Sequence, residues 1–123
     1  MTQKRRDNHS TEFGLWLRNQ KEIDSSLGYI TTNIDYVWTN YKTNQWMFLE
    51  EKRFNRYPYF YQERIFKKID KLAKIDPDYH GFHIVVFEKT NPEDGKIYID
   101  RNLVSKEEFL RFLQFNSKFS KRR

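Results

Sequence analysis

The chain has 123 residues, which is enough for one domain with its own hydrophobic core and too short for two ordinary domains. It contains no cysteine, so disulfides, a thiolate nucleophile and cysteine-ligated zinc are excluded. No apolar run approaches the roughly 20 residues of a membrane-spanning helix, and the first ten residues lack the apolar core of a signal peptide. We therefore expect a cytoplasmic protein with no membrane association.

The formal charge of +6 sits at the two ends of the chain, and the segment 11–117 is neutral overall. We expect basic tails over 1–9 and 117–123 around a single domain over 10–116. Within that domain, residues 52–74 hold eight cations and two carboxylates. This concentration predicts a surface for a polyanion. A solvated helix face with solubilising tails is the alternative.

The first half of the chain predicts a helix followed by a β-hairpin. Ser10 or Thr11 is suited to cap the helix, because both residue types accept backbone N–H groups at helix starts. β-branched and aromatic residues favour the two hairpin strands, and polar residues favour the turn. The expected elements are a helix to about Ile23, a short strand within 25–30, a strand over about 33–41, a turn over 42–45 and a strand over 46–54.

The second half predicts a long helix, two strands and a last helix. From 59 to about 75, apolar residues recur at helical spacing behind Pro58, which suits a first helical turn. Strands are expected over 81–88 and 96–100, and Ser105 with Glu108 forms a capping box for the last helix. The element order predicts a central mixed β-sheet flanked by helices, in an α/β fold or, as the alternative, an α+β fold.

The strand WMFLEEKRF (46–54) ends in charged residues that share a face with an acid on the partner strand. If Tyr41 pairs with Trp46, Asp35 lies opposite Lys52. Residues two apart on a strand point to the same face, so Glu50 joins them while Glu51 and Arg53 point to the other face. A loop of three residues would break this arrangement.

Two converging carboxylates repel each other unless a cation lies between them, and oxygen ligands suit Mg²⁺. A lysine beside such an ion could orient or deprotonate a bound water, which suits phosphodiester hydrolysis. The alternative is an ordinary cross-strand pair of Asp35 and Lys52, which contributes little to stability.

The spacing of Asp35, Glu50 and Lys52 resembles the PD-(D/E)xK nuclease superfamily. The resemblance covers about residues 10–90 and implies a restriction-endonuclease-like αβββαβ core. It implies that Asp35 and Glu50 bind Mg²⁺ or Mn²⁺, that the Glu51 carbonyl adds a ligand, and that Lys52 serves the attacking water. Glu12 corresponds to an acid that some members use as a further ligand. Its alternative role is to place a favourable charge at a helix N-terminus.

Gln62 corresponds to an active-site glutamine of the RecB-like and exonuclease branches of this superfamily. Those branches favour tyrosine where this chain has Phe66, and Ile34 replaces the proline of the PD element. The subfamily therefore stays open.

The segment 53–61 alternates cations with aromatic residues, a composition that can stack bases. We expect instead that Phe54 and Phe60 pack the long helix onto the sheet. His80 and His83 are a weaker metal candidate, because no third ligand follows nearby. The residues expected to contact nucleic acid are Arg53, Arg56, Arg64, Lys67, Lys68 and Lys71.

The expected function is a Mg²⁺- or Mn²⁺-dependent deoxyribonuclease, in particular an endonuclease. We expect a homodimer that cleaves DNA of particular structure or in repair, of the kind found in phages or mobile elements, with RNA left open as a substrate. The alternative is a protein of the same fold without the chemistry, either a nucleic-acid-binding module or an inhibitor or regulatory subunit that grips an acidic partner.

Overall fold

The structure, a computed structural model, describes residues 11–120 in two units, one ending at Thr32 and the other beginning at Asn33. The tail expected over 1–9, the capping candidate Ser10 and the last three residues of the C-terminal tail lie outside the described residues. Within the described range, no helix is long and apolar enough to cross a membrane.

The first unit contains α1 (Glu12–Arg18), which begins behind Thr11. The Thr11 hydroxyl accepts the Gly14 N–H at 3.0 Å, as expected of an N-cap. The helix ends before the expected Ile23. The Gln20 side chain donates to the Trp16 carbonyl at 3.0 Å and so occupies an acceptor of the last turn.

Two short 3₁₀ turns follow, η1 (Lys21–Ile23) and η2 (Ser25–Leu27). The strand expected within 25–30 is therefore wrong. Asp24 accepts both the N–H of Ser26 at 3.0 Å and its hydroxyl at 2.6 Å, which favours a turn over an extended chain.

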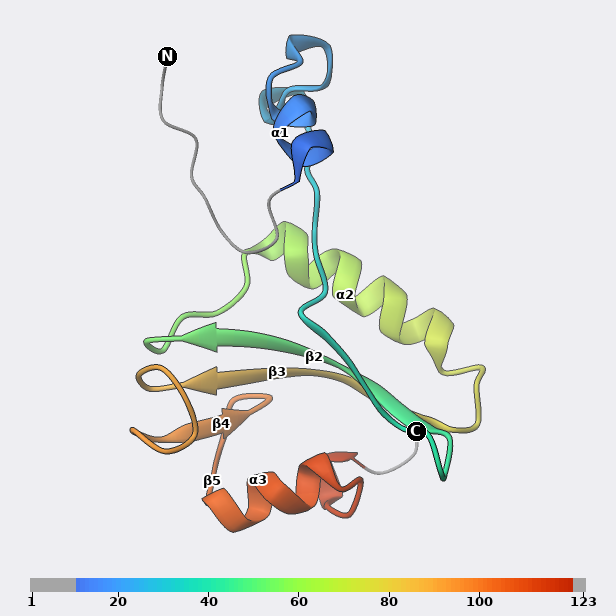
Figure 1. The fold of residues 1–123 in the computed structure, drawn as a ribbon, viewed down its shortest axis with the longest axis vertical. Coiled ribbons are helices and arrows are strands. Elements are labelled where there is room, and N and C mark those ends of the chain that lie inside the picture. Colours follow the sequence, from blue (N-terminus) through green and yellow to red (C-terminus); the bar gives the residue numbers. More distant parts are fainter. Residues whose placement is uncertain (1–10, 121–123) are drawn as a thin grey trace. The chain divides into compact units, whose positions relative to one another are not determined.

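The second unit is built on one five-stranded sheet in which the strands lie in chain order. Strands β2 and β3 run parallel and are joined through α2, whereas the other neighbours are antiparallel (Figure 1). The expected α/β class with a mixed sheet is confirmed. The strands are β1 (Tyr36–Asn40), β2 (Gln45–Arg53), β3 (Tyr79–Phe87), β4 (Ile97–Ile99) and β5 (Asn102–Val104).

The hairpin of β1 and β2 closes over residues 41–44, so that Asn40 pairs with Gln45. The expected pairing of Tyr41 with Trp46 is wrong. Asn40 ends its strand because its side-chain oxygen accepts the Lys42 N–H at 2.9 Å, and its carbonyl accepts the Asn44 N–H at 2.8 Å. Such local bonds compete with strand pairing. The register is displaced by two residues, an even number, so every side chain keeps its expected face.

One face of the sheet is covered by α2 (Phe60–Ala73), close to the expected helix over 59–75. Phe66 of α2 is buried and stacks on Phe82 of β3, with ring centroids 4.5 Å apart. Asp70 adds polar contacts, since it accepts the Tyr79 hydroxyl at 2.7 Å and the Phe82 N–H at 3.2 Å. These bonds fix the helix against β3.

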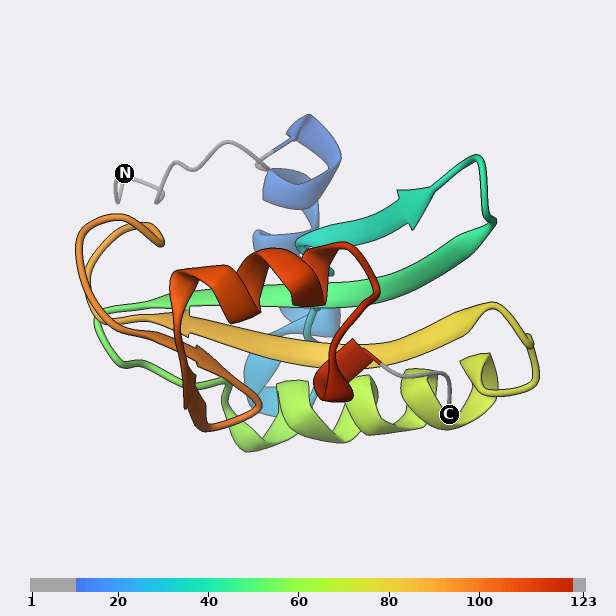
Figure 2. The same ribbon diagram turned by 90° about the horizontal axis from the view of Figure 1, so that it is seen from below.

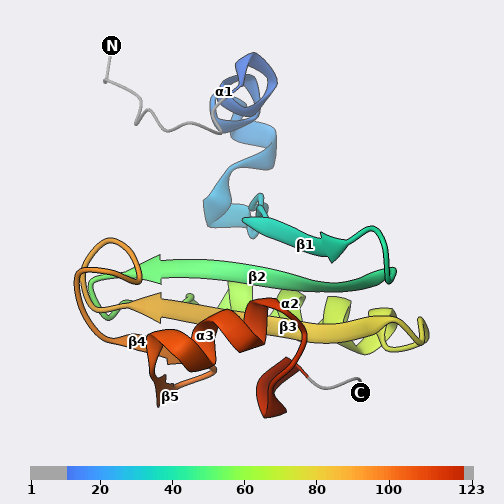
Figure 3. The ribbon, with the colours of Figure 1, turned by 60° about the horizontal axis from the view of Figure 1, so that its bottom comes forward.

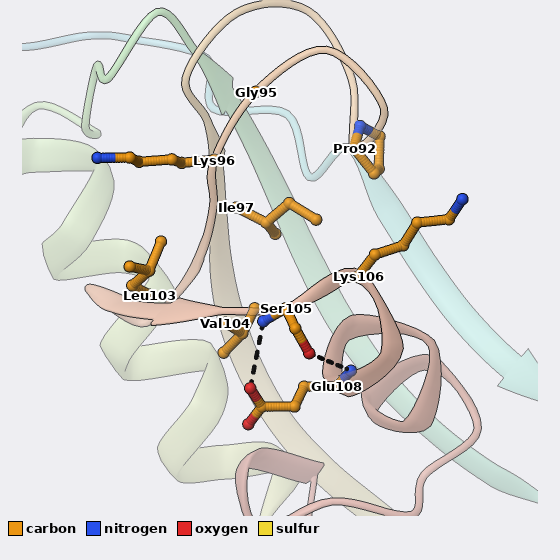
Figure 4. Close-up of a pocket in the computed structure, with 9 residues that line it drawn as sticks. All are labelled: Pro92, Gly95, Lys96, Ile97, Leu103, Val104, Ser105, Lys106 and Glu108. Atoms are coloured by element: carbon orange, nitrogen blue, oxygen red, sulfur yellow. Dashed lines mark hydrogen bonds between the residues drawn. The ribbon is translucent and has the colours of Figure 1, made fainter.

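The other face is covered by α3 (Lys106–Leu113), as the views from below show (Figures 2 and 3). The expected capping box is confirmed: Ser105 Oγ accepts the Glu108 N–H at 3.1 Å, and Glu108 accepts the Ser105 N–H at 3.2 Å (Figure 4). The main apolar core lies beneath this helix. It contains Met47, Leu49, Val85, Phe87, Ile97, Ile99, Val104, Phe109, Phe112 and Phe115.

Candidate functional site

Strand β2 divides its side chains between the two faces of the sheet. Met47 and Leu49 belong to the core beneath α3, whereas Phe48 contacts Phe82 on the α2 side. Alternation then places Glu50 and Lys52 on the α2 side. Lys52 Nζ lies 3.1 Å from Glu50 Oε2.

Asp35 lies one residue before β1 and reaches the same part of β2. Its Oδ2 accepts the backbone N–H of Glu51 at 2.9 Å. In the observed register, one further pair beyond Tyr36 and Leu49 would set Asp35 opposite Glu50. The sequence predicted Lys52 directly opposite Asp35, with Glu50 as its diagonal neighbour. In the structure these two residues exchange positions relative to Asp35, and the cluster of three residues is retained.

Glu50 is the most unusual member of this cluster, because it is a carboxylate with only 2% of its surface exposed. Its Oε2 contacts Lys52 and the Asp35 backbone N–H approaches the carboxylate, but Oε1 is buried and makes no hydrogen bond of normal geometry within residues 11–120. Buried polar atoms are almost always paired, and an unpaired one costs free energy. Glu50 Oε1 is therefore the acceptor in this cluster that the described residues satisfy least.

The electrostatics of the cluster follow from this burial. Desolvation raises the pKa of Glu50, and the negative charge of Asp35 raises this pKa further. The hydrogen bond and charge of Lys52 oppose the rise, as does the backbone N–H of Asp35. Folding thus makes ionisation of Glu50 less favourable than it is in water. A cation placed beside Asp35 and Glu50 would reverse that effect.

The Glu51 side chain points to the opposite face, as expected. Its Oε1 accepts the Tyr36 hydroxyl at 3.1 Å and its Oε2 accepts Arg53 Nε–H at 2.9 Å. The hydrogen bond to Glu51 raises the pKa of Tyr36 and that of Arg53. Only the backbone of Glu51 can therefore contact the cluster of Asp35, Glu50 and Lys52. Arg53 is an exposed cation that forms an ion pair with Glu51.

The cluster offers few oxygen donors to a divalent ion. In the described range, no group of three or more His, Cys, Asp or Glu residues is placed to hold a metal. Mg²⁺ is commonly held by one or two carboxylates and keeps several waters. Asp35 and the unpaired oxygen of Glu50 fit that smaller donor set. Glu12 belongs to the first unit, where it is exposed in the first turn of α1.

Gln62 has a structural partner in the described chain. It lies in the first turn of α2, where its Oε1 accepts the Tyr59 N–H at 3.2 Å. This bond satisfies a backbone donor at the helix start. The bond occupies one lone pair of the side-chain oxygen, and the amide retains its two donors.

The ring nitrogens of both histidines face protein atoms. His83 is fully buried, with Nδ1 2.7 Å from Asp100 Oδ2 and Nε2 2.8 Å from the His80 carbonyl. His80 Nδ1 contacts the Ser120 carbonyl, and its Nε2 lies 3.4 Å from Gln45 Nε2. These contacts make the pair a structural feature of the core, not a metal site.

The cations expected to contact nucleic acid lie on the surface. Glu63 Oε1 lies 3.4 Å from Arg101 Nη2. Lys74 Nζ lies 3.6 Å from Asp70 Oδ2. The exposed cations of the loop after β2 and of α2 are Arg56, Arg64, Lys67, Lys68 and Lys71.

The aromatic residues beside these cations differ most from expectation. Phe54 is 58% exposed and Phe60 is 71% exposed, so their expected packing against the sheet is wrong. The ring that anchors this loop is Tyr57, which lies under the Arg101 guanidinium at 4.1 Å. Sequence reasoning missed this role because Arg101 is more than 40 residues away along the chain.

A pocket on another part of the second unit contains none of the expected site residues (Figure 4). Its one carboxylate, Glu108, is used in the capping box of α3. The pocket is lined by Pro92, Gly95, Lys96, Ile97, Leu103, Val104, Ser105, Lys106 and Glu108. It offers no comparable set of catalytic groups.

Three kinds of comparison with known proteins were informative only in finding no match. No protein-family model, no curated protein and no solved structure matches the chain.

Proposed function

We propose that this protein is a divalent-metal-dependent nuclease of the PD-(D/E)xK type that hydrolyses phosphodiester bonds in DNA. The observation that carries the proposal is the buried Glu50 carboxylate, which has one unpaired oxygen beside Asp35 and Lys52. A core residue that served only packing would gain nothing from a buried charge of this kind. Carboxylates that are costly to bury are concentrated at functional sites.

In this proposal Asp35 and Glu50 hold Mg²⁺ or Mn²⁺, with the Glu51 carbonyl as a further ligand. The ion would polarise the phosphate and offset the charge that develops on its oxygens. Hydrolysis adds a water oxygen to phosphorus, breaks the bond to one sugar oxygen and returns a proton to that oxygen. Lys52 orients the attacking water and supplies positive charge beside the phosphate.

The sheet supports the proposal at a coarser level. A hairpin that carries the acids is followed by a basic helix and by a strand parallel to the second hairpin strand. The proposed αβββαβ core has one strand more between its helices than the two found between α1 and α2 in the described chain. The proposal therefore depends on the arrangement around Glu50 more than on the complete core.

The proposal extends to a homodimer that acts on structured DNA. A single domain of this size offers little surface for gripping a duplex, and two copies would present two active sites, one for each strand. Light scattering under the conditions of cleavage tests this part. A monomer that cleaves both strands would contradict it and leave the chemistry unaffected.

The experiment is incubation of the purified protein with branched, duplex and single-stranded DNA and with RNA, in Mg²⁺, Mn²⁺ or EDTA. We expect metal-dependent cleavage that is lost in Asp35→Ala and Lys52→Ala. Lys106→Ala is the matched control, because Lys106 also pairs with a glutamate, Glu93, at 2.7 Å, on an exposed surface. Binding without cleavage in every metal would favour the nucleic-acid-binding alternative instead.

A further inference from the structure

The connection between β2 and α2 presents aromatic rings to solvent. Phe54, Tyr59 and Phe60 are 58%, 67% and 71% exposed. In the same loop Pro58 is buried, and Tyr57 is held under Arg101. The loop therefore has anchored residues of its own, and the exposed rings are not needed to fix it to the sheet.

The exposed rings are already arranged as aromatic neighbours. The rings of Tyr59 and Tyr61 are stacked, with centroids 5.5 Å apart and planes inclined by 21°. Phe60 meets Tyr61 edge to face, also at 5.5 Å. Flat faces of this kind stack on nucleobases whatever their identity, because every base has a π-face.

The backbone that carries Phe54 is strained. Phe54 and Asn55 both have positive φ, 56° and 58°. Asparagine tolerates this left-handed region, but a bulky residue such as phenylalanine is rare there. The turn is held by the end of β3 and the residues after it: the N–H groups of Phe54 and Asn55 donate to the carbonyls of Lys89 and Phe87, each at 3.3 Å. Strain of this type is concentrated at functional sites.

Exposed cations flank these rings and decide the kind of partner. Arg56 follows Phe54 and Asn55 in the chain, and Arg64 lies one turn into α2. A partner that matches both properties carries flat aromatic groups and regular negative charge. Single-stranded nucleic acid has both, whereas a duplex hides its base faces within the stack.

We infer that Phe54, Tyr59, Phe60 and Tyr61, together with Arg56 and Arg64, form a platform that binds unpaired nucleotides of single-stranded DNA. Phe54 directly follows the end of β2, the strand that carries Glu50 and Lys52 of the proposed cleavage site. If the protein cleaves DNA as proposed, its favoured substrate has a single-stranded segment next to the scissile bond. This part of the inference rests on the proposed function. Binding itself does not depend on cleavage.

The test measures fluorescence anisotropy of a labelled oligothymidylate and of a labelled duplex of equal length, in EDTA so that no cleavage occurs. We expect tighter binding of the single strand. Phe54→Gly should weaken single-strand binding by about 5-fold to 150-fold, which corresponds to the loss of one base–aromatic stack. The protein should still fold, because glycine suits the left-handed backbone and the lost ring is exposed.

Asn55→Gly is the matched control. Asn55 also has a positive φ, so glycine suits its backbone as it suits that of Phe54. Asn55→Gly leaves all the aromatic rings of the platform in place, so binding of the single strand should stay at the wild-type value. Phe60→Ala provides a second ring removal at a helical position that accepts alanine well, and it should weaken binding in the same way. Arg56→Ala should lower the slope of log affinity against log salt by about 0.7, whereas Phe54→Gly should leave this slope unchanged.

Three results would overturn the inference: no binding to the single strand, preference for the duplex, or unchanged binding in both Phe54→Gly and Phe60→Ala. Unchanged DNA binding together with loss of self-association in these variants would point to a protein–protein surface instead. Failure of the proposed function is separate, because it appears as a lack of cleavage in Mg²⁺ and Mn²⁺ while single-strand binding in EDTA persists.

Discussion

The backbone N–H of Glu51 donates to Asp35 Oδ2 at 2.9 Å, and this bond joins the entry of the hairpin to the charged half of β2. Asp35 precedes β1, so its side chain extends the contact between the strands where backbone pairing has ended. The same strand then presents the Glu50 carboxylate on the face that Asp35 approaches. The bond between Asp35 and the Glu51 N–H therefore belongs both to the end of the hairpin and to the cluster of Asp35, Glu50 and Lys52.

Glu50→Gln is expected to stabilise the protein near neutral pH. The substitution removes a buried charge and its repulsion with Asp35, at the expense of the ion pair with Lys52. We expect the free energy of unfolding to rise by about 1–3 kcal/mol, because the neutral amide costs less to desolvate than the carboxylate and is not repelled by Asp35. Denaturant unfolding at about pH 7.5 measures it. A loss of stability would show that the ion pair with Lys52 outweighs desolvation.

The gain from Glu50→Gln should depend on pH. Since the pKa of Glu50 is raised on folding, its contribution to stability is fully present below its unfolded pKa and is lost as pH rises through the folded pKa. The difference between variant and wild type should therefore shrink as pH falls from about 8 to about 4. Glu93→Gln, at an exposed ion pair, is the control and should show little change. A difference independent of pH would contradict the electrostatic explanation.

Divalent ions should stabilise the wild-type protein. An ion bound only by the folded state at 100 times its dissociation constant adds about 2.7 kcal/mol to the free energy of unfolding. Asp35→Asn and Glu50→Gln should abolish the rise in melting temperature with Mg²⁺ or Mn²⁺, and Glu93→Gln should retain it. An equal rise in all four proteins would place the ion elsewhere.

Asp70→Ala should destabilise the second unit by about 2–3 kcal/mol. It removes the acceptor of the Tyr79 hydroxyl and of the Phe82 N–H, both of which join α2 to β3. Lys74→Ala removes only a half-exposed ion pair with Asp70, so it should cost less than about 0.5 kcal/mol. Thermal and denaturant unfolding compare the two variants. Equal losses would mean that the ion pair, and not the hydrogen bonds, holds the helix.

The hairpin register has its own direct measurement. Cross-strand nuclear Overhauser effects should join Val37 to Phe48 and Thr39 to Trp46. Nuclear Overhauser effects between Val37 and Glu50 would instead show the register predicted from the sequence, in which Tyr41 pairs with Trp46 and Lys52 lies opposite Asp35.

The face on which each charged residue lies could be predicted from the sequence, because side chains alternate with a period of two along a strand. A displacement of two residues in register leaves this alternation intact, so the cluster of Asp35, Glu50 and Lys52 survives the error. The displacement itself could not be predicted, since it depends on the Asn40 side chain bonding within the turn.

The exposed aromatic residues could not be predicted from composition. Phenylalanine usually lies in a core, and no local signal shows that Tyr57 is the anchored ring while Phe54 and Phe60 face solvent. That outcome depends on Arg101, which approaches from the turn between β4 and β5. The depth at which Glu50 is buried is likewise a tertiary property, because the alternation along β2 predicts only the face on which it lies.

Cleavage of branched DNA by wild type, Lys52→Ala and the control Lys106→Ala, in Mg²⁺ and in EDTA, tests the proposed chemistry most directly. We predict that wild type and Lys106→Ala cleave in Mg²⁺ only, and that Lys52→Ala, folded and still able to bind the DNA, does not cleave. Equal cleavage by Lys52→Ala and wild type, or no cleavage of branched, duplex or single-stranded DNA by wild type in any divalent ion, would contradict it.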